Sequence, residues 1–151
     1  MARYSACFNR AAASTTLAMG ILQASATPRR IKLYQLVLGS EATAANTALI
    51  WTVDRVTADG SIAGGTAVTP NPLDPADAAA LTTGLEGTIT TNPTIGANLA
   101  QFPLNQQATL IWEAPPGGEL VSPATDNNGF AIQTPTSTAI AVTATAFFQE
   151  Q

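Results

Sequence analysis

Histidine is absent from this chain of 151 residues, and cysteine and lysine occur once each, as Cys7 and Lys32. The lack of histidine removes the most common general base, the most common metal ligand and every Ser–His or Cys–His catalytic pair. A single cysteine cannot form an internal disulfide, and the sequence has no phosphate-binding loop, dinucleotide fingerprint or EF-hand spacing. The sequence therefore predicts a protein that is not an enzyme and that holds no cofactor and no metal.

Charged residues are also scarce, at 11% of the chain against a usual quarter. The hydrophobic fraction of 46% is ordinary, and the length suits one domain, so the chain can bury a core. No run of 18 apolar residues is present to span a membrane. A weakly charged surface is poorly protected against association, which is expected of a protein that works inside an assembly. We therefore expect a homo-oligomer.

The few charges are segregated along the chain. All six bases precede residue 56, where only Glu41 and Asp54 oppose them, and residues 56–151 contain eight acids and no base. The two parts carry +4 and −8, which sum to the net charge of −4. This asymmetry either arises by chance among few charges or marks a docking face. The pI near 4.5 and the small number of bases argue against a nucleic-acid partner.

Apolar and polar residues alternate with the two-residue period of β-strands along most of the chain. In residues 30–38, for example, Ile31, Leu33 and Val37 share one face, and in residues 106–114 we expect Trp112 to be buried on the inner face. Gly, Pro and Asn turns separate the segments, which favours an all-β antiparallel sandwich. Further strands are expected at residues 2–8, 48–57, 62–69, 87–91, 98–102, 119–122, 129–134 and 139–149.

One short helix is predicted at residues 75–81. Asp74 suits the N-cap, Pro75 suits the first helical position, and Gly84 is a suitable stop. Alanines at residues 11–22 favour a second helix there, although this segment also has strand-like neighbours.

Two acidic groups offer weak alternatives to a structural role. Glu113 and Glu119 flank a Pro-Pro-Gly-Gly turn, but two solvated acids at a hairpin tip do not make the cleft that a glycosidase needs. Asp59, Asp74 and Asp77 could supply oxygen ligands to calcium, but helix capping already accounts for Asp74 and Asp77.

Five distinctive sequence segments occur between residues 39 and 120, and an Ala/Thr-rich C-terminal part follows them. They are Gly39-Ser40-Glu41-Ala42-Thr43, Trp51-Thr52-Val53-Asp54-Arg55, Ala58-Asp59-Gly60, Thr69-Pro70-Asn71-Pro72-Leu73-Asp74-Pro75-Ala76-Asp77 and Ala114-Pro115-Pro116-Gly117-Gly118-Glu119-Leu120. Because of these segments, residues 30–150 resemble a family of small tailed-phage proteins that decorate or cement the capsid and stabilise the head. The resemblance implies a jelly-roll-like sandwich on the capsid surface of a virion, with the major capsid protein as partner.

Two other hypotheses stay open. One is another virion part, such as a fibre, tail or neck sandwich. The other is a carbohydrate- or protein-binding module, in which Trp51, Trp112, Tyr4 and Tyr34 would form an aromatic platform, although aromatic residues in strands more often belong to a core or an interface.

Residues 1–30 lie outside the resemblance, and residues 31–151 already contain enough strands for the sandwich domain. We interpret residues 1–30 as an N-terminal arm or edge strand that adds to a neighbouring subunit, with alternate side chains filling pockets and arginines facing acids. One alternative is that this segment forms a core strand. Another is a cleaved signal peptide, but Ser14, Thr15, Thr16 and Gly20 make its central region too polar for a signal. The interface residues predicted on this basis are Arg3, Tyr4, Phe8, Arg10, Arg29 and Arg30.

Overall fold

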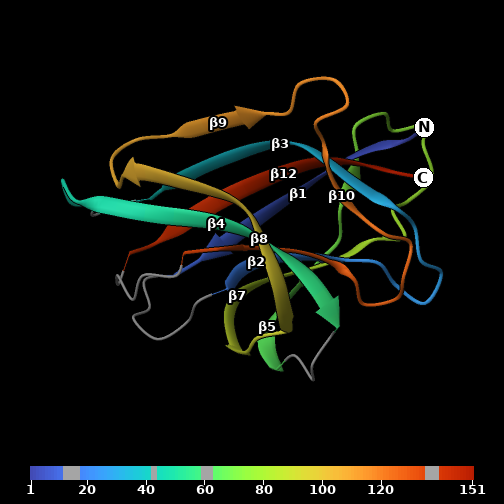
Figure 1. The fold of residues 1–151 in the computed structure, drawn as a ribbon, viewed down its shortest axis with the longest axis horizontal. Helices are drawn as coiled ribbons and strands as arrows, with labels where there is room; N and C mark the ends of the chain where they lie inside the picture. The colour runs from blue at the N-terminus through green and yellow to red at the C-terminus, as the bar shows by residue number, and fades with distance from the viewer. Residues whose placement is uncertain (12–17, 42–43, 59–62, 135–139) are drawn as a thin grey trace.

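The computed structural model describes residues 1–11, 18–41, 44–58, 63–134 and 140–151 (Figure 1). These residues form twelve strands and no helix. The strands make two antiparallel sheets of six strands each, and one apolar cluster contains residues of both sheets. The protein is therefore an all-β sandwich, as its alternating sequence predicts.

The first sheet holds both chain termini, and its central strands are β3, β12 and β1. The strand order is β10-β3-β12-β1-β6, with β9 beside a different part of β3 from β10. The strands are β1 (Arg3–Arg10), β3 (Ile31–Ser40), β6 (Asn71–Pro72), β9 (Leu110–Glu113), β10 (Leu120–Ser122) and β12 (Val142–Glu150).

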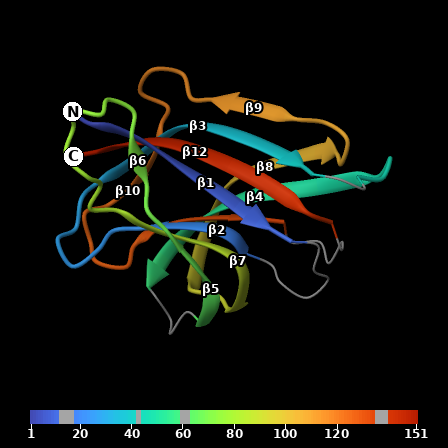
Figure 2. The same cartoon turned by 180° about the vertical axis from the view of Figure 1, so that it is seen from behind.

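The second sheet packs against the first, as the view from behind in Figure 2 shows. Its strand order is β5-β7-β2-β11-β4-β8, so β2 and β11 are internal and β5 and β8 lie at the edges. The strands are β2 (Ala18–Gln23), β4 (Ala48–Ala58), β5 (Ala63–Val68), β7 (Thr83–Thr91), β8 (Thr94–Asn105) and β11 (Gly129–Gln133).

The core lies between the two sheets and follows from the two-residue period. Along β12, every second residue from Val142 to Phe148 is buried. Trp51 and Phe130 meet these side chains from the second sheet. Neighbours on β2 belong to different apolar clusters, Leu22 to this core and Ile21 to a smaller one with Val56, Ile89 and Ala131. Because consecutive strand residues point to opposite faces, the second sheet is covered on both faces around β2.

The two strands that the structure describes within residues 1–30, β1 and β2, are part of the sandwich rather than an arm. All eight residues of β1 pair with β12, and β2 lies between β7 and β11. Phe8 fits against Gly20, where a Cβ atom would lie 2.6 Å from the Phe8 ring. Alternation predicts that residues 2–8 form a strand, but it does not say whether the partner strand belongs to the same chain. Here the partner strand is the chain's own C-terminal strand.

The helix predicted at residues 75–81 does not form. Asp74 does cap a turn, since its Oδ1 accepts the Ala76 N–H at 2.9 Å and its carbonyl accepts the Asp77 N–H at 3.0 Å. The chain then continues without a helix, because a segment this short gains little from helical hydrogen bonds and its backbone groups find tertiary partners instead. Of residues 11–22, where alanines favour a second helix, residues 12–17 lie outside the described residues and residues 18–23 form β2. No helix capable of spanning a membrane occurs in the described parts of the chain.

Candidate interaction surface

One end of the sandwich gathers half of the charged residues around the two chain termini (Figures 1 and 2). We call this end the terminal face. Four bases and four acids lie there, so the formal charges cancel. They are Arg3, Arg29, Arg30, Lys32, Asp74, Asp77, Glu119 and Glu150.

Backbone hydrogen bonds fix the segments that carry these residues. Arg30 and Gln151 exchange two bonds of 3.0 Å, so the C-terminus is tied to the start of β3. The Leu73 N–H donates to the Arg3 carbonyl at 2.8 Å, which ties the loop after β6 to the start of β1. The terminal face is therefore built on paired strands.

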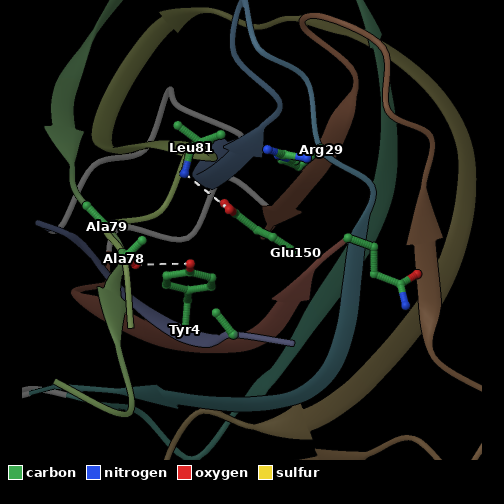
Figure 3. A pocket seen from close by; sticks show the side chains of 8 residues that line it. Tyr4, Arg29, Ala78, Ala79, Leu81 and Glu150 are labelled. Atoms are coloured by element: carbon green, nitrogen blue, oxygen red, sulfur yellow. Dashed lines mark hydrogen bonds between the residues drawn. The ribbon is translucent and has the colours of Figure 1, made fainter. Parts of the chain in front are cut away.

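A cavity of about 300 Å³ opens at this end, and Figure 3 shows its lining side chains. The Tyr4 hydroxyl donates to the Ala78 carbonyl at 3.1 Å, and the Tyr4 ring stacks on Phe148 with centroids 5.6 Å apart. The Glu150 carboxylate accepts the N–H groups of Leu81 at 3.2 Å and Thr82 at 2.6 Å. These contacts hold the chain after the Asp74 turn and give the cavity an apolar wall with a charged rim.

The charges around this cavity act on Tyr4. Burial raises the pKa of the Tyr4 hydroxyl, the carboxylates of Glu150 and Asp77 raise it further, and the nearby Arg29 guanidinium opposes them. The neutral hydroxyl is therefore favoured in the folded protein, where it remains a hydrogen-bond donor.

Two more cavities share Arg3 and lie beside the first. One of about 340 Å³ is lined by Met1, Arg3, Leu73, Asp74 and Asp77. The other, of about 240 Å³, is lined by Arg3, Tyr34, Ala114, Pro116, Glu119 and Gln149. In the cavity of about 240 Å³, the pKa of Glu119 is lowered by hydrogen bonds from the backbone N–H groups of Glu119 itself and of Gly117. The nearby Lys32 makes a smaller contribution in the same direction. Arg3 therefore stands between two hollows with carboxylates in each.

The structure divides the six predicted interface residues into two groups. Arg3, Arg29 and Arg30 are exposed and lie on the terminal face. Tyr4 and Phe8 belong to the core, with exposed fractions of 3% and 0%. Arg10, at the other end of β1, is also buried, and burial lowers the pKa of its guanidinium. The three buried residues cannot contact a partner while this fold is closed, which corrects their predicted role.

Sequence reasoning did not identify Lys32 or the acids of the terminal face as interface residues. The bases lie early in the chain and the acids late, but β12 runs antiparallel to β3 and places Glu150 beside Ile31. Pairing therefore mixes in space the charges that are segregated in sequence, so the two halves do not form separate basic and acidic faces at this end.

The acidic residues singled out in the sequence have structural partners. Glu113 accepts a hydrogen bond from the Gln35 amide at 2.9 Å, and Glu119 accepts the Gly117 N–H at 3.3 Å. Asp59 lies outside the described residues, and among the described ones no group of acids, cysteines or histidines is arranged to hold a metal ion.

The buried carboxylate of Asp54 also has structural partners. It accepts hydrogen bonds from Thr52 at 2.7 Å, Gln133 at 2.7 Å and Asn98 at 2.8 Å. These three bonds link β4 to β11 and β8 and supply the partners that a buried carboxylate needs.

The four aromatic residues suggested for a sugar platform do not share a surface. Trp51 is fully buried and Tyr4 nearly so. Trp112 is half-buried, in contrast to its expected burial, and packs near Phe102 with ring centroids 6.0 Å apart. Tyr34 lines a cavity of the terminal face. A platform of all four residues is therefore excluded in this fold.

Comparison with known proteins finds no matching family model, no similar curated protein and no similar solved structure.

Proposed function

We propose that the protein is a virion structural protein that decorates or cements the capsid surface by bridging neighbouring subunits of the major capsid protein, without catalysis. The sequence segments that resemble phage decoration proteins suggest this role, and the terminal face is the structural observation that supports it. A jelly-roll-like connection of the strands belongs to the same proposal.

The terminal face suits a binding role because it presents charges of both signs on a fixed frame. Arg3, Arg29 and Arg30 are exposed, and the three cavities beside them can accept side chains of a partner. Complementary charges at such a surface accelerate association and select the correct partner. Exposed ion pairs are screened at ordinary ionic strength, so binding should weaken as salt is added.

Binding to particles tests this proposal. Particles that lack the protein are mixed with the recombinant chain and sedimented, and the bound fraction is measured against concentration. The double variant Arg3→Glu/Arg29→Glu should weaken binding by about ten-fold or more, because acids would face acids at the contact. Both side chains are exposed, so circular dichroism should show an unchanged fold.

Glu41→Arg provides the control, because Glu41 is exposed just after β3, at the opposite end of the strand from Arg30. A strand of this length separates the two sites by roughly 30 Å, and we expect this variant to bind like the wild type. Unchanged binding of the double variant, or no binding of the wild type, contradicts the proposal. Electron microscopy that locates the protein on a tail, neck or fibre would favour another virion part, and glycan binding would favour a carbohydrate module.

A further inference from the structure

Five strands of the described chain lie at sheet edges, namely β5, β6, β8, β9 and β10. An edge strand presents unpaired N–H and C=O groups that can pair with another chain. Proteins usually block such edges with proline, charge, bulges or very short strands.

Three of the edges carry a recognisable block. In β5, Gly64 and Gly65 have positive φ angles of 77° and 81°, and the pairing register shifts around them. The β6 strand has only two residues and includes Pro72. At β10, the Val121 carbonyl accepts a hydrogen bond of 2.8 Å from the Arg55 guanidinium, which reaches over from the second sheet.

The β8 edge is blocked by a proline, as its hydrogen-bond pattern shows. The Gln106 N–H donates to the Thr47 carbonyl at 3.0 Å, in the register that pairs Pro103 with Ile50. Because hydrogen-bonded and non-hydrogen-bonded pairs alternate along antiparallel strands, the backbone of Pro103 faces away from β4. Proline has no N–H to offer there, and register shifts disturb the pairing closer to Thr94.

The β9 edge has four residues without a proline, and its pairing with β3 shows no register shift; its one charged residue, Glu113, is the last of the strand. The Ala114 N–H donates to the Tyr34 carbonyl at 2.8 Å in the register that pairs Ile111 with Val37. The same alternation therefore turns the backbone N–H and C=O groups of Ile111 and Glu113 away from β3. The Ile111 side chain is 62% exposed, and β9 lies at the rim of the molecule in both views (Figures 1 and 2).

The surroundings of β9 favour a second copy of the chain as its partner. Each copy carries a net charge of −4, so copies repel one another except where the approaching surfaces lack charge. The 26 residues from 87 to 112 contain no charged residue, and they include β8, which joins β9 and packs beside it through Phe102 and Trp112. Two identical edges related by a two-fold axis run antiparallel, as pairing of this kind requires.

We infer that β9 pairs antiparallel with β9 of a second copy, with Ile111 opposite Glu113 of that copy. In this register the outward N–H and C=O groups of Ile111 and Glu113 form four hydrogen bonds across the two-fold axis. The two first sheets join into one continuous sheet, and the pair forms at the β9 edge, next to the cavity of the terminal face that Ala114 lines. The inference goes beyond the capsid contact and does not depend on it.

Opposite charge changes at Ile111 test the pairing in solution without particles. Sedimentation equilibrium of the full chain over a range of concentrations should show a monomer–dimer equilibrium. Ile111→Glu should weaken dimerisation by about ten-fold, because like charges would lie opposite each other twice across the axis. Ile111→Lys should retain dimerisation within about three-fold, because its ammonium would face Glu113 of the second copy.

Ile50→Glu supplies the matched control, because Ile50 is another exposed isoleucine, on β4 of the second sheet. It should dimerise like the wild type, and the thermal unfolding of all three variants should confirm that they fold. A monomeric wild type overturns the inference, as does dimerisation that survives Ile111→Glu. The inference is also overturned if Ile111→Glu and Ile111→Lys weaken dimerisation equally, or if Ile50→Glu weakens it as much as Ile111→Glu does. In either case apolar contact alone would explain the association.

Discussion

The terminal face and the β9 edge offer two different kinds of contact on one small sandwich. The terminal face holds four bases, four acids and three cavities, and most of its binding groups are side chains. The β9 edge has a single charged residue, Glu113, and offers backbone groups and one exposed apolar side chain. A chain with few charges can thus concentrate them where a charged partner is selected and leave few of them where a copy of itself is bound.

The two regions should also respond differently to salt. Contacts through exposed charges weaken as ionic strength rises, whereas the backbone hydrogen bonds between two β9 edges do not depend on such charges. Added salt should therefore release the protein from particles while leaving dimers intact, and the following changes sharpen this comparison.

The largest effect is expected from a truncation that starts at Thr27. It removes β1 and β2, so β12 loses a partner along its whole length, and β7 and β11 lose the strand between them. The truncated chain should fail to fold, with no cooperative unfolding transition in circular dichroism. A truncated chain that unfolds cooperatively near the wild-type temperature would return residues 1–26 to the role of an arm and remove Arg3 from the frame of the terminal face.

Replacing the two tryptophans in turn compares the core with the region beside β9. Trp51 is fully buried between the sheets, so Trp51→Ala should lower the free energy of unfolding by about 3–5 kcal/mol. Trp112 is half-buried, so Trp112→Ala should cost about 1–2 kcal/mol, because fewer contacts are lost. Urea unfolding of both variants measures the difference, and the opposite order of costs would mean that the β9 side belongs to the central core.

A smaller effect is expected from Tyr4→Phe at the terminal face. Loss of the hydrogen bond to the Ala78 carbonyl should lower the free energy of unfolding by about 1 kcal/mol at neutral pH. The variant should also respond less to alkali. Because the pKa of Tyr4 is raised in the folded state, stability is fully present below the unfolded-state pKa near 10 and falls as pH rises through the folded-state pKa.

Urea unfolding at neutral pH and at about pH 11 measures this difference. Burial also raises the pKa of Tyr34, so Tyr4→Phe should reduce the alkaline loss of stability without abolishing it. An identical loss in the wild type and the variant would show that the pKa of Tyr4 is not raised in the folded protein.

Strands could be predicted from the sequence because alternation is a local property. Residues 129–134 and 139–149 are examples, since β11 spans Gly129–Gln133 and β12 spans Val142–Glu150. Whether residues 75–81 form a helix could not be predicted from such a local property. The capping signal at Asp74 is real, but distant groups decide the outcome. The Tyr4 hydroxyl binds the Ala78 carbonyl, and the Glu150 carboxylate binds the N–H groups of Leu81 and Thr82.

The candidate surface was predictable only in part. Arginine is a reasonable interface residue wherever it is exposed, and Arg3, Arg29 and Arg30 are exposed on the terminal face. The burial of Arg10 and the approach of Glu150 to the start of β3 both depend on the pairing of β12 with its neighbours. Local sequence patterns do not predict that pairing. The sequence therefore does not show that acids and bases far apart along the chain lie close together in the fold.

Electron cryomicroscopy of decorated particles tests the central claim most directly. We expect the terminal face to lie against the major capsid protein, with Arg3, Arg29 and Arg30 in contact with it, while the β9 edge faces another copy of the chain or solvent. Particles in which these three arginines point to solvent and a different face rests on the capsid would contradict it.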